Sequence, residues 1–145
     1  MITPKKNCNL CPRLKQYRDK YKILKPDWHN APVESFGKID AKILIVGLAP
    51  GLKGANKTGR PFTGDHAGKL LYTTLIKFKL ATGVYKGIFN DKLKLHNTRI
   101  TNSVRCVPPK NKPDIIEKNN CRKFLESEIK NMHNLKLILA LGSIT

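Results

Sequence analysis

The sequence predicts an α/β protein in which a mostly parallel central sheet lies between two layers of helices, giving three layers in all. Two continuous apolar runs and one alternating segment have the character of strands, and segments with helical periodicity lie between them. Strands that alternate with helices favour a parallel sheet covered on both faces. With 145 residues, of which 40% are hydrophobic, residues 1–145 fit a single domain with one core.

The first half of the chain contains one predicted strand between two predicted helices. Leu14, Tyr17 and Tyr21 recur at helical spacing in a short basic segment. Residues 42–48, KILIVGL, form an apolar run that leads into a glycine-rich loop, as expected for a strand buried on both faces. Residues 68–81 follow that loop and carry the apolar stripe of an amphipathic helix.

The second half contains two further predicted strands. Residues 97–106, NTRITNSVRC, alternate β-branched and polar residues and end at the turn-forming sequence VPPKNKP. Apolar residues follow a helical period after Pro113, a residue type that suits the first turn of a helix. Residues 135–142, LKLILALG, form a second apolar run and predict a third buried strand.

The charge of the chain favours a polyanionic partner. Its 28 Lys and Arg residues against 10 Asp and Glu residues give a formal net charge of +18. Such an excess most often serves phosphate contacts, so nucleic acid is the first candidate, and a lysine-rich composition by itself is the alternative explanation. The N-terminal sequence MITPKKNCNL lacks a secretory signal, and no apolar run is long enough to cross a bilayer. We therefore expect a cytoplasmic protein without a membrane partner.

The loop at residues 47–68, GLAPGLKGANKTGRPFTGDHAG, is the candidate ligand site. It connects a predicted strand to a predicted helix, where backbone N–H groups converge in α/β proteins. A phosphate-binding loop does not fit, because Asn56 stands where a glycine is required before the Lys-Thr pair. Asp65 is the single acid of this loop. Taken alone, it is equally well explained as a helix N-cap, and Phe62 as a core residue.

The four cysteines are Cys8, Cys11, Cys106 and Cys121. In a reducing compartment they are metal ligands or free thiols rather than disulfides. One close C-x-x-C pair is followed by two separate cysteines, so the second close pair of a zinc ribbon is absent from the sequence. Spacing alone leaves a shared metal site and buried free thiols equally open.

These segments together carry a resemblance to a known family. The stretch GLAPGLKGANKTGRPFTGDHAG resembles the first motif of the iron–sulfur uracil-DNA glycosylases, specifically of the family 5 branch. In register with it, CNLCPRL resembles the family's N-terminal cysteine pair, and ITNSVRCVPPKNKP with Cys121 resembles its second strand and remaining ligands. Leu48 favours family 5, because the family 4 branch usually carries Glu at this position.

The resemblance implies excision of uracil, and of other deaminated bases such as hypoxanthine, from single- or double-stranded DNA by base flipping. Phe62 matches the residue whose ring stacks on uracil, and Asn102 matches the amide that hydrogen-bonds the pyrimidine edge. Asp65 matches the acid of family 5, which stabilises the cationic sugar of the transition state or orients water. Three further residues match the floor of the base pocket: Leu48, Ala49 and Pro50.

The resemblance also implies a [4Fe–4S] cluster, which would link the N-terminal segment to residues 106–121. Its ligands would be Cys8, Cys11, Cys106 and Cys121. Family members continue past Thr145 with a helix, a final strand and a histidine-bearing motif. The domain is therefore expected to be incomplete at its C-terminus, with an unpaired edge at the third strand. Loss of one transition-state donor typically costs about a hundredfold to a thousandfold in rate, so we expect weak or no activity from this chain alone.

The sequence leaves two other functions open. One is a non-catalytic, cluster-stabilised module that binds nucleic acid through its phosphates. The other is a zinc-binding structural protein. In each case we expect a monomer.

Overall fold

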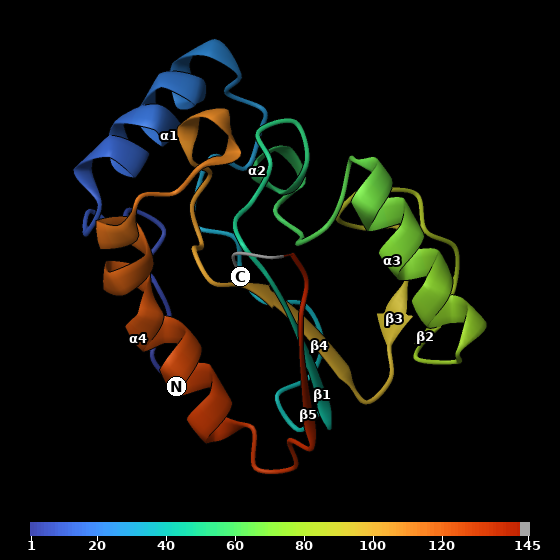
Figure 1. Ribbon diagram of the computed structural model, residues 1–145. Coiled ribbons are helices and arrows are strands. Elements are labelled where there is room, and N and C mark those ends of the chain that lie inside the picture. Colours follow the sequence, from blue (N-terminus) through green and yellow to red (C-terminus); the bar gives the residue numbers. More distant parts are fainter. Residues whose placement is uncertain (143–145) are drawn as a thin grey trace.

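The computed structural model describes residues 1–142 and contains a three-stranded parallel sheet with helices on both faces (Figure 1). The strand order is β4–β1–β5, with β1 at Ile43–Gly47, β4 at Thr98–Asn102 and β5 at Leu137–Ala140. Both strand pairs of this sheet are parallel. The predicted α/β class with a parallel central sheet is therefore confirmed.

Helices and short elements connect the strands of the sheet. The helices of the described residues are α1 at Pro12–Leu24, α2 at Ala55–Thr58, α3 at His66–Lys77 and α4 at Ile115–Asn131. The smaller elements are the antiparallel pair β2 at Ala81–Thr82 and β3 at Lys94–Leu95, and the 3-10 helix η1 at Pro109–Asn111. The sequence does not predict α2, η1 or the β2–β3 pair, because two to four residues are too few to show a period. No helix within residues 1–142 has both the length and the apolar character needed to span a bilayer.

Different helices cover the two faces of the sheet. On one face, Tyr72 of α3 packs in a cluster with Ile45 and Ile100. On the other face, Ile129 of α4 packs against the cluster that contains Leu44. Adjacent residues of β1 thus point to opposite helix layers, as the two-residue period of a strand requires. Each fully buried aliphatic side chain contributes roughly 1.5–3 kcal/mol to this three-layer packing.

The strand β5 lies at an edge of the sheet and is not the buried strand that its apolar sequence predicts. Leu137, Ile138 and Leu139 are 47%, 46% and 42% exposed. Among the described residues β5 pairs with β1 alone, so no strand covers its outer side. The expected unpaired edge at the third strand is present in this part of the chain, and the expected burial is wrong for the same reason.

The strand β4 ends at Asn102, earlier than the predicted strand at residues 97–106. After this point the chain bends, although the Val104 N–H still donates to Leu48 O at 2.9 Å. The bend carries the following residues out of the sheet and into the packing of α1 and α4, where Cys106 is buried. The early end of β4 therefore separates the glycine-rich loop at residues 47–68 from the cysteines.

Candidate active site

A pocket lies where the carboxyl ends of β1 and β4 meet, at the point where Gly47 pairs with Asn102. Its volume is about 110 Å³. The residues that line it are Leu48, Ala49, Pro50, Gly51, Ala55, Phe62, Thr63, Asp65, Asn102 and Leu141. The structure therefore brings together, around one cavity, every residue that the sequence resemblance assigns to base binding and catalysis.

The Phe62 ring lies beside the end of β1. A Cβ placed on Gly47 would be 2.5 Å from Phe62 Cζ and 2.6 Å from Asn102 Oδ1, so glycine alone leaves room for both side chains. Phe62 has a φ of 56°, a left-handed conformation that is rare for an aromatic residue. The ring also packs against the core under α3, so Phe62 is a half-buried residue that serves both the core and the pocket wall.

Two tyrosine hydroxyls hold the backbone around Phe62. Tyr72 Oη donates to Pro61 O at 2.6 Å, and Tyr85 Oη donates to Phe62 O at 3.4 Å. The two tyrosine rings stack with centroids 4.9 Å apart. Burial raises the pKa of both hydroxyls, so both remain protonated donors. These contacts offset the cost of the unusual backbone conformation, which is of order 1–3 kcal/mol.

The Asn102 side chain is buried at the pocket wall and is 4% exposed. Its main-chain oxygen accepts a hydrogen bond from Arg105 Nε at 3.0 Å. Its side-chain amide has no hydrogen-bond partner within the described part of the chain. A buried amide offers two donors and an acceptor, and leaving them unused is costly. The amide of Asn102 is therefore available to a ligand in the pocket.

Asp65 caps α3 and also lines the pocket. Its Oδ1 accepts a hydrogen bond from the Gly68 N–H at 2.7 Å, which confirms the N-cap interpretation. The carboxylate is nevertheless exposed and reaches both the pocket and the groove beside it. Gly68 allows the first turn of α3 to approach the loop, because a Cβ there would be 2.0 Å from Phe62 O. Capping thus fixes the acid at the mouth of the cavity.

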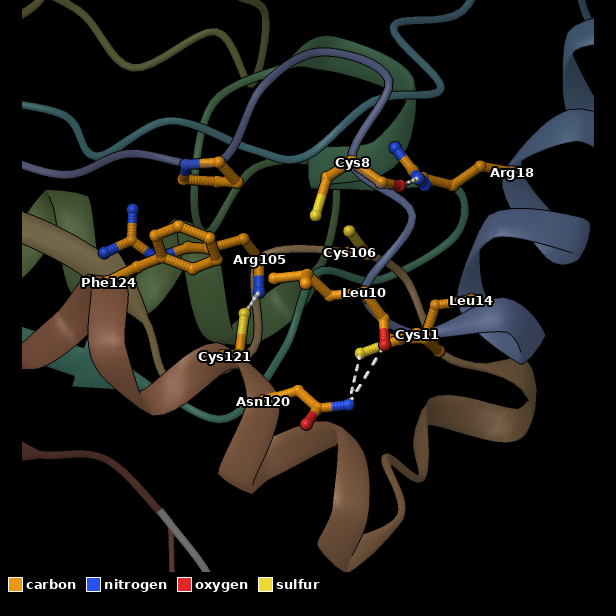
Figure 2. A pocket seen from close by; sticks show the side chains of 11 residues that line it. Cys8, Leu10, Cys11, Leu14, Arg18, Arg105, Cys106, Asn120, Cys121 and Phe124 are labelled. Atoms are coloured by element: carbon orange, nitrogen blue, oxygen red, sulfur yellow. Dashed lines mark hydrogen bonds between the residues drawn. The ribbon is translucent and has the colours of Figure 1, made fainter.

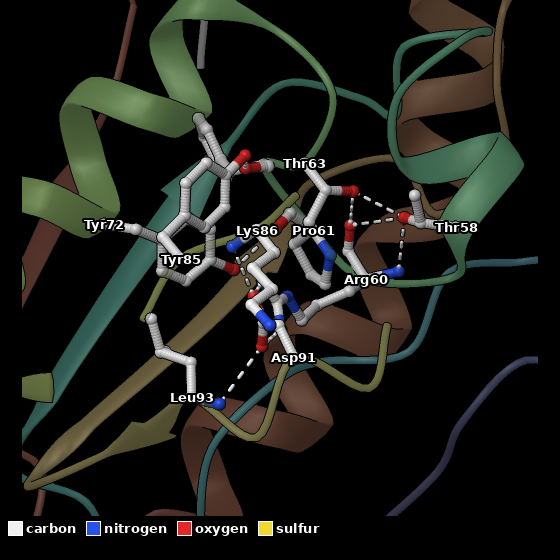
Figure 3. Close-up of polar contacts among 10 residues, drawn as sticks. Thr58, Arg60, Pro61, Thr63, Tyr72, Tyr85, Lys86, Asp91 and Leu93 are labelled. Carbon is white, nitrogen blue, oxygen red and sulfur yellow. Dashed lines mark hydrogen bonds and ion pairs between the residues drawn. The ribbon is translucent and has the colours of Figure 1, made fainter. Parts of the chain in front are cut away.

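A buried ion pair between Arg60 and Asp91 holds the loop at residues 47–68 in place (Figure 3). Arg60 Nη1 and Nη2 donate to Asp91 Oδ1 and Oδ2 at 2.6 and 2.8 Å, and the two side chains are 2% and 0% exposed. The guanidinium lies 5.0 Å from the ring centroids of both Phe36 and Tyr72. The sequence analysis missed this pair, because its partners stand 31 positions apart and no periodic pattern connects them.

Hydrogen bonding keeps the Arg60–Asp91 pair ionised. Burial alone would raise the pKa of Asp91, but hydrogen bonds from Arg60 and from the Lys86 and Leu93 N–H groups outweigh it and lower this pKa to about 2. Burial would likewise lower the pKa of Arg60, and the bonds to Asp91 raise it above its ordinary value. Both groups are therefore charged at neutral pH.

An open groove of about 550 Å³ adjoins the pocket. It is lined by Leu48, Ala49, Gly51, Leu52, Lys53, Gly54, Gly64, Asp65 and Asn111. The pocket and the groove share Leu48, Ala49, Gly51 and Asp65. The carboxylate of Asp65 therefore stands between the small pocket and the wider groove, on which Lys53 is exposed.

No histidine within residues 1–142 lines the pocket. His66 is exposed at the first position of α3, next to Asp65. The histidine-bearing motif that the resemblance leads us to expect after Thr145 lies outside the described residues.

The four cysteines line a second cavity, between the N-terminal segment, α1 and α4 (Figure 2). Cys106 and Cys121 are buried, Cys8 and Cys11 are half-buried, and all four are free thiols. Burial raises the pKa of Cys106 to about 12, and it also raises the pKa of Cys11 and of Cys121. Thiols far apart in the sequence are thus gathered in one apolar environment.

Two of these sulfur atoms accept hydrogen bonds. The Arg105 N–H donates to Cys121 Sγ at 3.3 Å, and Asn120 Nδ2 lies 3.8 Å from Cys11 Sγ (Figure 2). Among the described residues, no group of three or more His, Cys, Asp or Glu side chains is placed to hold a single metal ion. The thiols share a cavity without converging on one point.

The cysteine cavity also contains a buried cation. Arg18 lines the cavity and is 1% exposed. Its Nη2 donates to Cys8 O at 2.5 Å and its Nη1 to Lys6 O at 3.3 Å, whereas its Nε has no partner within residues 1–142. Buried charges are normally paired, so this guanidinium favours an anionic group in the cavity.

Arg105 links the cysteine cavity to the pocket. Its N–H contacts Cys121, its Nε donates to Asn102 O, and its Nη2 donates to Glu128 Oε2 at 2.6 Å. Glu128 is 1% exposed and also accepts from Arg99 Nε at 2.5 Å. The sequence analysis missed this network. Glu128 falls on the stripe of α4 that also buries Cys121 and Phe124, and this carboxylate was the signal that could have revealed the network.

Comparisons with known proteins find a matching family and several relatives. The family model of the uracil DNA glycosylase superfamily matches residues 34–145. The chain is 41% identical over 143 residues to a type-5 uracil-DNA glycosylase of Thermus thermophilus, which covers 94% of this chain and 64% of that protein. It is 36% identical over 142 residues to a type-5 uracil-DNA glycosylase of Pyrobaculum aerophilum, with 95% and 62% covered. A type-4 uracil-DNA glycosylase of the same organism is 35% identical over 141 residues, with 97% and 58% covered. The chain thus spans less than two thirds of the length of these relatives.

Proposed function

The chain belongs to the uracil DNA glycosylase superfamily, and on that basis we propose that it excises uracil from DNA by hydrolysis of the N-glycosidic bond. The observation that carries this proposal is the single pocket shared by Phe62, Asp65 and Asn102 at the carboxyl edge of the sheet. Open α/β sheets bind ligands at this edge, because loop N–H groups and helix N-termini converge there. We expect the protein to act in the cytoplasm.

The pocket supports recognition of a flipped pyrimidine. A base extruded from the stack is read through its face and its Watson–Crick edge. The Phe62 ring, held over Gly47, supplies the face, and the unpartnered amide of Asn102 supplies donor and acceptor groups for the edge. Leu48, Ala49 and Pro50 form the remaining wall.

The carboxylate of Asp65 supports the hydrolytic step. The bond between C1′ of the sugar and the base nitrogen breaks, and the base departs with the electron pair. The oxygen of water adds to C1′, and the proton that this water loses ends on the departing base. Positive charge develops on the sugar, and a nearby carboxylate stabilises it or orients the water. The N-cap bond occupies Oδ1, whereas Oδ2 accepts no hydrogen bond from the described residues and is available for this role.

The groove beside the pocket supports DNA as the substrate. It opens next to Asp65, carries the exposed Lys53, and belongs to a chain of net charge +18. A nucleotide that enters the pocket needs a path for the strand on either side, and the groove, with Lys53 available to a phosphate, provides it. We propose single- or double-stranded DNA as the partner and a monomer as the active form.

We further propose that Cys8, Cys11, Cys106 and Cys121 hold a [4Fe–4S] cluster. Such a cluster takes four thiolates, and its ligands surround a group of atoms rather than one ion. The residues fit this group: four free thiols line one cavity, N–H donors reach two of the sulfurs, and Arg18 is a buried cation without an ion-pair partner among residues 1–142. When bound, the cluster would tie the N-terminal segment to α4 and to residues 103–106.

The rate of uracil excision by the Asp65→Asn variant tests the proposed function. Asn caps helices about as well as Asp, so this variant removes the negative charge while α3 stays capped. We expect single-turnover excision from a duplex with one uracil, scored as abasic sites, to fall about a hundredfold or more. The matched control Asp114→Asn alters the N-cap of α4, outside the pocket, and should retain the rate.

Two results would contradict the proposal. Undiminished excision by Asp65→Asn would remove that residue from the reaction. Absence of excision, both from the chain and from a version extended with the C-terminal part of a type-5 relative, would reject the enzyme. Strongly salt-dependent binding without excision would then identify a nucleic-acid-binding module.

A further inference from the structure

A cationic aromatic cluster lies outside the candidate active site. The rings of Tyr21 and Trp28 stack with centroids 6.1 Å apart and planes 2° from parallel. Lysine ammonium groups lie over both rings. We call this cluster the Trp28 patch, and it consists of Lys20, Tyr21, Lys25, Trp28 and Lys57.

The Trp28 patch holds two like charges over one ring. Lys25 Nζ and Lys57 Nζ each lie 5.9 Å from the Trp28 ring centroid, although they come from different segments. Each cation–π contact is a weak attraction at an exposed site. Both lysines are exposed, and neither forms an ion pair with a carboxylate of the described residues, Asp27 beside Trp28 included. Each ammonium group is therefore free to pair with an external anion.

Buried amides join the Trp28 patch rigidly to α2. Asn30 is 1% exposed and donates from Nδ2 to the main-chain oxygens of Lys25 and Trp28 at 2.8 and 3.3 Å. Its Oδ1 accepts from Asn56 Nδ2 at 2.9 Å, and its N–H donates to Asn56 O at 3.1 Å. The left-handed φ of 45° at Asn30 makes this double contact possible. The patch therefore cannot move independently of α2.

The segment around α2 connects the Trp28 patch with the pocket and the groove. Lys53, just before this helix, lines the groove, and Ala55 lines the pocket. Lys57, near the end of the same helix, lies over Trp28. Cationic side chains thus continue from the groove to the patch along five residues of chain. The patch and the groove are therefore joined through one short segment of chain.

We propose that the Trp28 patch binds backbone phosphates of DNA beside the nucleotide that occupies the pocket. This inference rests on the proposed function and names a surface through which the substrate is held. Backbone phosphates fit the chemistry of the patch, because Lys25 and Lys57 each offer an exposed ammonium group to a separate phosphate. The stacked rings hold the lysine side chains in place, which lowers the entropy lost on binding.

Trp28 itself reports on this contact, since it is the single tryptophan of the chain. We would titrate the full chain with duplex DNA that contains no uracil, and follow both tryptophan fluorescence and the anisotropy of labelled DNA. We expect a saturable fluorescence change whose midpoint coincides with the anisotropy midpoint. Because undamaged DNA is used, the outcome does not depend on base excision, and the abasic-site assay above separately tests the proposed function.

Neutralisation of the patch lysines isolates their role. The double variant Lys25→Gln with Lys57→Gln should weaken DNA binding about tenfold or more at 0.1 M salt. It should also reduce the slope of log affinity against log salt by about 2, because each lost phosphate contact accounts for about 0.9. The matched control, Lys77→Gln with Lys94→Gln, removes two exposed lysines at the end of α3 and in β3, which lie across the molecule from α1 (Figure 1). This control should change the affinity less than threefold.

Three results would overturn the proposal. One is DNA binding, seen by anisotropy, without any change in Trp28 fluorescence. Another is an equal loss of affinity in the patch variant and the control variant, which would indicate a diffuse charge effect. The third is an affinity of the patch for duplex RNA that exceeds its affinity for duplex DNA at least tenfold, which would assign a different partner.

Discussion

The phenyl ring of Phe62 rests on the backbone of Gly47, and a methyl group at Gly47 would stand 2.5 Å from Phe62 Cζ. This relationship joins the end of the central strand to the wall of the pocket. It also explains why the strand ends in glycine, since no other residue admits both the ring and the Asn102 amide. The position of the proposed stacking ring is therefore set by the sheet rather than by the loop alone.

Substitution of Gly47 by Ala should displace the Phe62 ring. We expect uracil excision to fall roughly a hundredfold, because a shift of about 1 Å in a positioning group costs that much. The free energy of unfolding should fall by about 1–3 kcal/mol from overpacking. Single-turnover excision and urea unfolding measure the two effects. Gly51→Ala is the control, because a Cβ there meets nothing within 4 Å although Gly51 also lines the pocket. Equal activities of the two variants would contradict the stacking role.

The Arg60–Asp91 pair should make stability depend on pH below 5. The pKa of Asp91 falls from an ordinary 3.8 to about 2 in the folded state. Its contribution is therefore fully present above about pH 5 and is lost as the pH falls toward 2. A shift of this size corresponds to roughly 2 kcal/mol. Urea unfolding at a series of pH values measures the loss.

The Asp91→Asn variant isolates that contribution. At neutral pH it should lower the free energy of unfolding by about 3–5 kcal/mol, because Arg60 is left as a buried, unpaired charge. Its stability should also vary less with pH between 5 and 2 than that of the unmodified protein. Asp19→Asn, at a solvent-exposed ion pair with Lys15 and Lys22, is the control and should change stability little. Parallel pH profiles for the protein and Asp91→Asn would reject this account.

Replacement of Cys106 by Ser tests the proposed cluster. Protein purified without oxygen should be brown and contain iron and sulfide, and Cys106→Ser should lose the colour and most of the iron. Ser103→Ala alters the same segment without lining the cysteine cavity, and should keep both. Elemental analysis with visible absorption gives the readout. Stoichiometric zinc in a colourless protein would instead support the structural zinc alternative.

The apolar side chain of Leu48 should broaden the range of bases. Leu48→Glu places a charged group that reaches one bond further into a pocket of about 110 Å³, where it would obstruct a purine. We expect the ratio of hypoxanthine to uracil excision to fall about tenfold, measured with matched duplexes. Leu52→Glu lines only the groove and is the control. A ratio unchanged by Leu48→Glu would show that this position does not select the base.

Much of the pocket was predictable from the sequence, because most of its residues lie in one continuous segment. Leu48, Phe62 and Asp65 all belong to the loop after β1, and the N-cap role of Asp65 is a local interaction. Asn102 joins them because the parallel register pairs Gly47 with Asn102. The apolar strand β1 and the strand β4, whose polar and β-branched residues alternate, therefore end at the same edge of the sheet.

By itself, the sequence determined the strand–helix alternation, the ligand loop and the capped start of α3, because hydrophobic periodicity and turn chemistry act between near neighbours. Only the tertiary structure decided that the apolar strand β5 lies exposed at an edge and that Arg60 is buried against Asp91. It also decided that Lys57 and Lys25 both lie over the ring of Trp28. Those features depend on which segments meet in space, and contacts between distant segments follow from the packing of the layers around the sheet rather than from any local pattern.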